Sequence, residues 1–438
     1  MIRFDAAPLL AAARSAPRVR HLGRVVRAVG LLIEARGAAA PVGELVEIER
    51  RGAPPLLAEI AGFRDGATLL MPLGEADGLL AGALVRPLER RLTAPCGEAL
   101  LGRVLDGLGR PADGKPAPIC FDERPLVAEA PAPYLRAPIE RPLETGISVI
   151  DGFLTLGRGQ RVGIFAGSGV GKSTLLGELA KRASADVNVI ALVGERGREV
   201  GAFIEETLGP EGMKKSIVIA AASDAPAMVR IKAGYVATAI AEWFRDRGQD
   251  VMLLFDSVTR FAAASREVGL ALGEPPTTKG YPPSFFSAMP KLVERFGRTK
   301  TGSITALCTV LVDGDDMNDP VADTLRGLLD GHVVLSRALA RRRHPAVDVL
   351  GSVSRLMDRV TVPEHKDAAA AVRRMLAVYE DAKDLISVGA YKSGSDPKVD
   401  KAIRSISDAE ALLAQKTGEV RPFAETVRRL RELAAKNA

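Results

Sequence analysis

The stretch GIFAGSGVGKSTLLGELAKR, residues 163–182, places the strongest constraint on how this chain folds. An apolar run ends at Ala166, a loop of small residues continues to Gly171, and Lys172 opens a segment with the pattern of an amphipathic helix. The backbone N–H groups of such a loop, together with the positive end of the following helix dipole, form a cradle for phosphate. A glycine-rich turn that only connects a strand to a helix is the alternative.

A phosphate loop would give each residue of this stretch a role. The general pattern is G-x-x-x-x-G-K-[ST], and the chain departs from it once, because Ala166 stands where the first glycine is usual. Lys172 would reach the β- and γ-phosphates of a nucleotide, and the Ser173 hydroxyl would hold Mg²⁺. The residues predicted to line ATP here are Gly167, Ser168, Gly169, Val170, Gly171, Lys172, Ser173 and Thr174.

Strand and helix patterns alternate from about residue 145 to 345. The apolar runs are typical of buried parallel strands, and they are RVGIFA, VNVIALV, SIVIAA, DVMLLF, SITALCTVLV and HVVLS. Helical patterns lie between them, at residues 172–184, 226–247 and 284–297. This alternation predicts an α/β fold with a mostly parallel sheet that helices cover on both faces.

The flanking regions follow other patterns. Residues 21–90 contain short aliphatic runs separated by regularly spaced glycines, which predicts a small β-sandwich or β-barrel. Eight prolines from Pro111 to Pro142 exclude regular helix and central strand, so this segment is either an ordered wrap or a linker. After about residue 362, apolar residues recur at helical spacing. We therefore expect β, α/β and helical parts in that order.

Composition narrows the class of protein and its surroundings. The 438 residues carry a net charge of +6 from 60 basic and 54 acidic side chains, a balance that does not demand nucleic acid. Three scattered cysteines and four dispersed histidines indicate neither a disulfide framework nor a zinc site, and they fit a reducing compartment. Residues 1–20 fit a short helix or tail better than a signal peptide, because Asp5 and Pro8 interrupt their apolar core. No run of 18 apolar residues suggests a membrane span, and we expect a cytoplasmic protein.

Charged residues follow two of the predicted strands, at the edge where ligands bind to an open parallel sheet. Glu195 lies in GERGRE after VNVIALV, and Asp256 follows DVMLLF. Such an aspartate is typical of a Walker B strand, whose carboxylate holds the metal beside the β- and γ-phosphates. Taken singly, the aspartate would also fit a helix cap and the glutamate a surface ion pair. Together with the phosphate loop they predict Mg²⁺-dependent ATP hydrolysis, with Glu195 orienting the attacking water.

Five blocks of sequence extend this interpretation to nearly the whole chain. They are RGQRVGIFAGSGVGKSTLL, VGERGREV, LLFDSVTRFA, GEPPTTKGYPPSFF and PAVDVLGSVSR. In this order they resemble the catalytic-subunit family of rotary and secretion ATPases, and most closely the flagellar type III protein-export ATPases. The last block matches the family signature P-A-V-D-x-x-x-S-x-S. The resemblance implies a RecA-like P-loop core, preceded by a small N-terminal β-barrel and followed by a C-terminal helical domain.

The resemblance also implies catalytic roles for the residues at matching positions. Lys172 matches the phosphate lysine, and Ser173 matches the hydroxyl that binds Mg²⁺. Glu195 matches the catalytic glutamate, and Asp256 matches the Walker B aspartate, a second metal ligand. The matching arginines are Arg196 beside the glutamate, Arg260 reaching the phosphate region, and Arg355, the finger offered to the neighbouring subunit's site.

One position departs from the rotary enzymes. The residue before PAVD is usually aromatic in those enzymes and stacks on adenine, whereas this chain has His344. His344 is therefore a candidate nucleotide-binding residue in a pocket whose base stacking differs from theirs.

The resemblance implies four segments and a set of partners. We expect a docking segment at residues 1–20, a β-barrel domain at 21–92, a P-loop ATPase domain at 93–361 and a helical domain at 362–438. The expected partners are further copies of the chain in a homohexamer, a regulatory protein at the N-terminus, a central stalk protein, the membrane export gate, and export substrates with their chaperones. The protein would lie in the cytoplasm, peripherally associated with the inner membrane at the export apparatus.

Related ATPases with other tasks fit these residues less well. Rotary catalytic subunits carry an acidic loop in the helical domain, where this chain reads YKSGSDP at residues 391–397. A hexameric RNA translocase would want aromatic platforms in its β-rich domain, and residues 1–90 contain only Phe4 and Phe63, so no nucleic-acid partner is expected. Virulence-type secretion ATPases are the main alternative, because sequence separates them poorly from the flagellar ones.

Overall fold

The computed structural model describes residues 21–312 and 319–436, and the expected docking segment at 1–20 lies outside the described residues. The chain divides into two compact units. One ends at Leu92 and includes Ala271–Gly273, and the other holds the remaining residues from Thr93 onward. The domain bounds expected from the sequence stay predictions.

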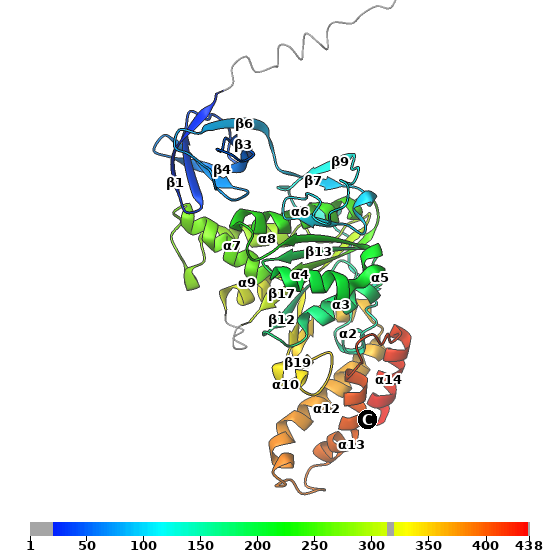
Figure 1. The fold of residues 1–438 in the computed structure, drawn as a ribbon. Helices are drawn as coiled ribbons and strands as arrows, with labels where there is room; N and C mark the ends of the chain where they lie inside the picture. Colours follow the sequence, from blue (N-terminus) through cyan, green and yellow to red (C-terminus); the bar gives the residue numbers. More distant parts are fainter. Residues whose placement is uncertain (1–20, 313–318, 437–438) are drawn as a thin grey trace, which may run out of the picture. The chain divides into compact units, whose positions relative to one another are not determined.

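The first unit is a closed six-stranded β-barrel, with strand order β1-β2-β5-β4-β3-β6 (Figure 1). Alternate side chains of each strand fill its interior, and Val46, Ile60 and Leu70 are fully buried. The turn Asp65-Gly66 joins two strands and has positive φ at both residues, as a two-residue hairpin turn requires. The strands are β1 (Gly23–Val29), β2 (Leu32–Arg36), β3 (Glu44–Ile48), β4 (Leu56–Arg64), β5 (Ala67–Pro72) and β6 (Leu84–Arg91).

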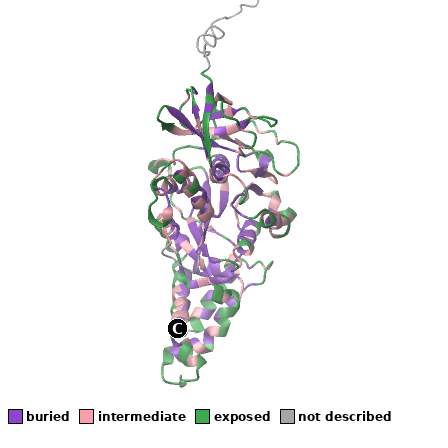
Figure 2. Ribbon diagram, turned by 60° about the vertical axis from the view of Figure 1, so that its left-hand side comes forward, coloured by how far each residue is buried: buried purple, intermediate pink, exposed green. Residues whose placement is uncertain are grey.

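A nine-stranded sheet forms the centre of the second unit, with order β19-β18-β12-β17-β15-β13-β14-β8 and β16 paired to β17. All six predicted strands are present and run parallel to one another, so the predicted fold class is confirmed. Five of them are buried along nearly their whole length, as expected for strands covered on both faces, whereas β18 alternates buried and half-buried residues (Figure 2). The six strands are β12 (Arg161–Ala166), β13 (Val187–Val193), β14 (Ser216–Ala221), β15 (Asp250–Asp256), β17 (Ser303–Leu311) and β18 (Gly331–Leu335).

The sheet also includes strands that the apolar pattern did not predict. At one edge β19 (Val347–Ser354) runs antiparallel to β18, and the short β16 (Gly297–Arg298) runs antiparallel to β17. At the other edge β8 (Val104–Asp106) pairs in parallel with β14. β8 precedes the proline-rich segment that begins at Pro111. The last strand at this edge therefore comes from a part of the chain that is far in sequence from the other strands.

Helices cover both faces of the sheet, and α6 (Ala227–Arg245) and α3 (Lys172–Arg182) lie on opposite sides of it (Figure 1). The predicted helices at 226–247 and 284–297 correspond to α6 and α8 (Pro283–Val293). The others in this part of the chain are α2 (Ser148–Phe153), α4 (Gly197–Ala202), the π-helical η3 (Phe203–Leu208), α5 (Gly209–Lys214), α7 (Val258–Ala271), α9 (Pro320–Leu328), α10 (Arg337–Ala340) and α11 (Met357–Val360).

The proline-rich segment is an ordered wrap rather than a linker. It holds β9 (Asp122–Pro125), which pairs with β7 (Thr93–Cys96). The Asp122 carboxylate accepts a hydrogen bond from Trp243 Nε1 on α6 at 2.9 Å. Arg295 donates to the backbone carbonyl of Leu126 at 2.6 Å, and its guanidinium pairs with Glu242 at 2.6 Å. Side-chain hydrogen bonds therefore attach the wrap to the sheet domain.

Three long helices follow the sheet, as the sequence predicts: α12 (Pro363–Ser387), α13 (Pro397–Leu413) and α14 (Phe423–Lys436). They pack on one another and on α2 through buried residues such as Val372, Ala402 and Leu430. Asp396 caps α13 by accepting from the Lys398 amide, and Pro397 occupies the first helical position. Within residues 21–312 and 319–436, no helix is both long enough and apolar enough to cross a membrane.

The buried pair of Arg295 and Glu242 gives a test of the fold. Both residues are at most 4% exposed, so R295M leaves a buried carboxylate unpaired and should lower the free energy of unfolding by about 3–5 kcal/mol. Chemical denaturation measures this change. The double variant E242M/R295M should recover most of the loss, and R428M, which breaks an exposed pair with Glu432, should cost less than about 1 kcal/mol. Equal losses in R295M and R428M would contradict the assignment.

Candidate active site

The predicted phosphate loop connects the end of β12 to the start of α3. Gly169 and Gly171 have φ of 78° and 89°, a left-handed backbone conformation that glycine adopts without strain. Gly171 is the N-cap of α3, so Lys172 begins the helix and its backbone is in the first turn. Further along α3, a Cβ on Gly177 would lie 2.0 Å from Thr207 Cγ2, so the absence of a side chain lets α3 pack closely against η3.

The Lys172 ammonium group lies between two carboxylates. Its Nζ is 2.5 Å from Asp256 Oδ1 and 3.3 Å from Glu195 Oε1. Asp256 is the last residue of β15, and Glu195 follows β13 by two positions. The three side chains are no more than 12% exposed. The carboxyl ends of neighbouring parallel strands thus bring three predicted residues together at one edge of the sheet.

The Glu195 carboxylate has a second cationic partner. Its Oε2 lies 3.2 Å from a guanidinium nitrogen of Arg260 on α7, and Arg260 also donates to the Gly194 carbonyl. The backbone carbonyl of Glu195 accepts from the Ser223 amide at 2.9 Å. Burial raises the pKa of Glu195, and the Asp256 charge adds to this effect, while Lys172 and Arg260 act in the opposite direction. The net pKa lies above the usual value for a glutamate.

Thr309 also contacts this cluster, and the sequence analysis did not identify it. Its Oγ1 donates to Asp256 Oδ1 at 2.7 Å from β17, the strand beside β15, and the residue is fully buried. The sequence does contain a signal for Thr309, which is a hydroxyl residue inside the apolar run SITALCTVLV. A buried hydroxyl needs a hydrogen-bond partner, so such a residue indicates a polar group nearby. Lys172 and Thr309 therefore both donate hydrogen bonds to the same oxygen of Asp256, Oδ1.

Two other predicted residues, Arg196 and Ser173, are exposed. The Arg196 side chain is 65% exposed, and its guanidinium pairs with Glu199 at 3.3 Å. Ser173 is exposed in the first turn of α3, beside Thr174. Among the described residues, no group of three or more His, Cys, Asp and Glu side chains is arranged to hold a metal ion. Mg²⁺ in nucleotide sites usually takes one or two carboxylates together with substrate phosphates and water, and the oxygen donors of Asp256 and Ser173 fit that preference.

His344 lies beside the phosphate loop rather than in the carboxylate cluster. It directly precedes Pro345 and β19, and its Nε2 is 2.9 Å from Glu178 Oε2 on α3. Its Nδ1 lies 3.8 Å from the position that a Cβ on Gly171 would occupy. The ring is 27% exposed. His344 is thus in contact range of the loop that is predicted to hold the nucleotide.

Arg355 lies near the start of β18, at the opposite end of the strands from its own phosphate loop. Ser354, at the end of β19, pairs with Gly331, the first residue of β18. The phosphate loop instead follows Ala166, which pairs with Leu335, the last residue of β18. The Arg355 guanidinium donates to the carbonyls of Leu329 and Arg326, each at 3.2 Å, and the residue is exposed. Within one chain, Arg355 does not reach Lys172 or Glu195.

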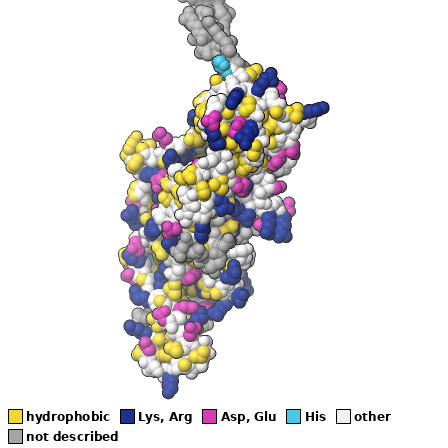
Figure 3. Space-filling view, turned by 90° about the vertical axis from the view of Figure 1, so that its left-hand side faces the viewer, with side chains coloured by type: hydrophobic (Ala, Val, Ile, Leu, Met, Phe, Trp, Pro, Cys, Tyr) yellow, Lys and Arg dark blue, Asp and Glu magenta, His cyan; other side chains and the backbone are white. Residues whose placement is uncertain are grey.

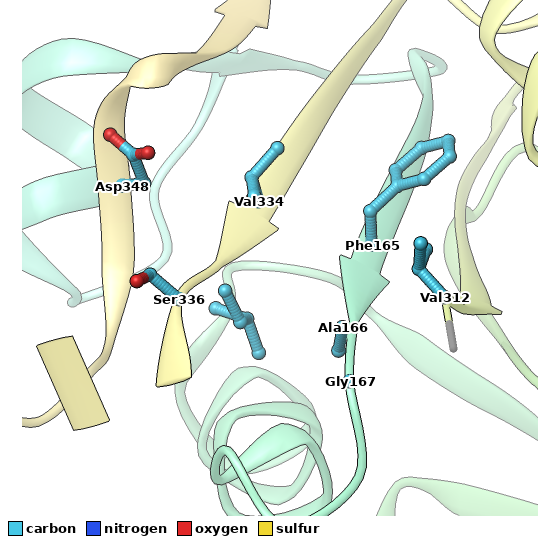
Figure 4. Close-up of a pocket in the computed structure, with 8 residues that line it drawn as sticks. Phe165, Ala166, Gly167, Val312, Val334, Ser336 and Asp348 are labelled. Atoms are coloured by element: carbon cyan, nitrogen blue, oxygen red, sulfur yellow. The ribbon is translucent and has the colours of Figure 1, made fainter. Parts of the chain in front are cut away.

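A pocket of about 180 Å³ adjoins the phosphate loop on its β18 side (Figure 4). Phe165, Ala166 and Gly167 line it from β12 and the loop, and Ser336 and Asp348 line it from the end of β18 and from β19. The Asp348 carboxylate accepts from the amides of its own turn. Val312, the residue after β17, lines it from the other side of β12, and the lining does not include Lys172, Glu195, Asp256 or Arg260.

Comparison with known proteins covers almost the whole chain. Residues 25–89 match the β-barrel domain of the ATP synthase alpha/beta family, residues 146–354 match the nucleotide-binding domain of that family, and residues 361–432 match the T3SS EscN ATPase C-terminal domain. The three matches follow the order of barrel, sheet domain and helices in the structure.

Individual relatives agree with these matches. The flagellum-specific ATP synthase of Bacillus subtilis is 50% identical over 94% of this chain and 95% of its own length. The type 3 secretion system ATPase of Xanthomonas euvesicatoria is 48% identical over 93% of each chain. A solved structure, the assembled ATPase EscN in complex with its central stalk EscO from enteropathogenic E. coli, has a TM-score of 0.87 at 42% identity and covers 94% of this chain and all of that one.

These matches confirm the resemblance inferred from the sequence blocks. The chain belongs to the ATP synthase alpha/beta family, among its flagellum-specific and type 3 secretion system ATPases.

Proposed function

We propose that this chain hydrolyses ATP, with Mg²⁺, to energise or assist the export of flagellar proteins through a type III secretion apparatus. The observation that carries the proposal is the convergence of Lys172, Glu195, Asp256 and Arg260 at the carboxyl edge of the sheet, directly beside the phosphate loop. These four side chains supply the charges that phosphoryl transfer to water requires, and no covalent intermediate is needed.

Nucleotide binding uses the loop and the first turn of α3. The backbone N–H groups of residues 167–173 would cradle the phosphates, aided by the helix dipole. The Lys172 ammonium group, now paired with Asp256 and Glu195, would turn to the β- and γ-phosphates. Asp256 and Ser173 would hold Mg²⁺. A bound Mg²⁺ would neutralise part of the charge that develops on the phosphate oxygens.

In this proposal Glu195 orients the attacking water. Its carboxylate is buried, and Arg260 fixes one of its oxygens, so the side chain has a defined orientation. The raised pKa makes this carboxylate a better proton acceptor than an exposed glutamate. Arg260 and Lys172 remain within reach of the charge that grows on the γ-phosphate, which is the largest stabilising contribution in such sites.

A second chain is required to complete the site. Arg355 and its own phosphate loop lie at opposite ends of the strands. We therefore propose that Arg355 acts as an arginine finger in the neighbouring protomer's site. The relative of known structure, EscN, is described as assembled and as bound to a central stalk. We propose that copies of this chain also assemble, into a closed homohexameric ring with a central stalk protein.

The end of the helical domain is suited to contact partners. The loop between α12 and α13 borders a cavity of about 550 Å³ lined by residues that include Tyr391, Lys401 and Arg404. Leu385 and Val388 are more than half exposed nearby, and Figure 3 shows hydrophobic side chains at this end of the molecule. The loop lacks the acidic run of rotary enzymes, which supports a stalk and export substrates with chaperones as its partners.

The remaining proposed partners follow from the proposed function in flagellar protein export. We propose that a regulatory protein binds residues 1–20, and that the ring is held peripherally at the inner membrane beside the export gate. A virulence-type secretion ATPase is the second candidate, because the relative from Xanthomonas euvesicatoria is 48% identical. The genes beside this one, flagellar basal-body or virulence-injection genes, distinguish the two.

The water-orienting role of Glu195 predicts the effect of E195Q. The amide keeps the shape of the side chain but cannot accept the proton, so kcat should fall by about 10²–10⁴-fold. Phosphate release measures turnover, and a fluorescent ATP analogue measures binding, which should change little. Near wild-type hydrolysis by E195Q would refute the catalytic assignment.

The location of Arg355 predicts complementation between two inactive variants. R355A should lose about 10³–10⁵ in rate while still binding ATP, because it lacks the finger that neutralises transition-state charge. In rings mixed from R355A and E195Q, some interfaces join an intact Glu195 to an intact Arg355, and hydrolysis should partly return. Mixed rings that are as inactive as either parent would show that Arg355 does not act between chains.

The hydrogen bond from Thr309 predicts a smaller effect. T309V removes the hydroxyl that holds Asp256 Oδ1, and the loss of one bond to a charged group should lower kcat/KM by about tenfold. T309S keeps the hydroxyl and should stay within about threefold of wild type. Steady-state ATPase kinetics distinguish the two variants, and a loss in T309S without a loss in T309V would indicate that packing of the methyl group, not the hydrogen bond, matters.

A further inference from the structure

Glu178 joins three segments of the chain that are far apart in sequence. It lies on α3, six residues after Lys172, and its side chain is only 8% exposed. Its Oε1 accepts from Arg182 at 2.8 Å and from the Gly418 amide at 3.1 Å, while its Oε2 faces His344 Nε2 at 2.9 Å. The phosphate-loop helix, the turn before β19 and the loop between α13 and α14 therefore meet at one carboxylate.

These contacts form a closed cycle. Besides the two bonds from Glu178 to His344 and Gly418, the Gln415 amide donates to the His344 backbone carbonyl at 2.7 Å. Gln415 is itself fixed, because its side-chain oxygen accepts from the Ser148 amide at 2.9 Å. Each pair among the three segments is thus joined directly, and a shift of one segment strains the contacts of the other two.

The charge state of Glu178 fits this arrangement. Burial alone would raise the pKa of the carboxyl, but the hydrogen bonds from His344 and Gly418, with the Arg182 charge, outweigh it, so that the net pKa is lowered. Glu178 is therefore an anion held among three donors. None of these contacts belongs to the carboxylate cluster of Glu195 and Asp256, and the mechanism above does not use them.

The cycle reaches the nucleotide site through His344. The ring has one nitrogen on Glu178 and the other 3.8 Å from the Cβ position of Gly171, the last glycine of the phosphate loop. We propose that Glu178 is a positioning residue. It holds His344 against the phosphate loop and ties the 415–419 loop of the helical domain to α3. Nucleotide binding and the hydrogen-exchange protection of the 415–419 loop are therefore coupled. The proposal rests on the ATP site proposed above.

Variants at the two ends of the contact test the positioning role. E178M removes both carboxylate oxygens and so all three hydrogen bonds, and H344N removes the donor to Glu178 while leaving the Glu178–Arg182 pair intact. Each should raise the Kd for the N-methylanthraniloyl derivative of ATP by about tenfold or more, and E178M should do so with kcat changed by less than about threefold. H344Q keeps a nitrogen near the Nε2 position and should stay within about threefold of wild type.

The double variant separates a shared contact from two independent effects. If His344 acts through Glu178, E178M/H344N should bind the analogue no more weakly than the weaker single variant. The matched control is E425M, which removes the carboxylate of an i,i+4 pair with Arg429 on α14, and it should leave the Kd unchanged. Full additivity in the double variant, or wild-type affinity in folded H344N, would overturn the proposal. If E178M fails to give a cooperative thermal transition, H344N and H344Q still decide it.

Hydrogen exchange tests the link to the helical domain. Exchange of the amides at 415–419 should slow when adenylyl-imidodiphosphate binds to the wild type and should not slow in E178M. Equal slowing in both would overturn the coupling. A wild-type protein that neither binds nor hydrolyses ATP would instead refute the proposed function, so the two failures are distinguishable.

Discussion

The Lys172 ammonium group and the carboxylates of Asp256 and Glu195 lie together, largely buried, at the carboxyl ends of parallel strands. A single buried charge of this kind would be strongly unfavourable, and the three are tolerated because each has an opposite charge or a hydrogen-bond donor beside it. β12, β13 and β15 must therefore end together, since a displaced strand would leave one of these groups unpaired. The pairing of the strands and the pairing of the charges enforce each other.

The general architecture was predictable because its signals are local. A run of six or seven apolar residues marks each buried strand, and the small residues from Gly167 to Gly171 mark the turn after β12. Glu195 and Asp256 could be placed near Lys172 because parallel strands that end at one edge bring their following residues together. The family and the fold class are confirmed, whereas the roles of individual residues stay predictions.

Other features depend on pairings that no local pattern contains. Thr309 acts on Asp256 only because β17 lies beside β15, and Glu178 meets His344 and Gly418 only after three distant segments have packed. β19 carries a recognisable signature, but its antiparallel course beside β18 is a property of the assembled sheet. Arg196 is the reverse case, because its place next to Glu195 in the sequence does not bring its exposed side chain into the cluster.

The edge strand β8 has a consequence for how this protein is divided into fragments. The match to the family's nucleotide-binding domain begins at residue 146, yet β8 and the Leu126 carbonyl that accepts from Arg295 lie before that position. A fragment expressed from residue 146 would keep the phosphate loop. It would lose the backbone hydrogen bonds between β8 and β14, and Arg295 would lose the Leu126 carbonyl as a hydrogen-bond acceptor. Unpaired sheet edges promote aggregation. The boundary at which homology becomes recognisable is thus not a boundary at which the polypeptide can be cut.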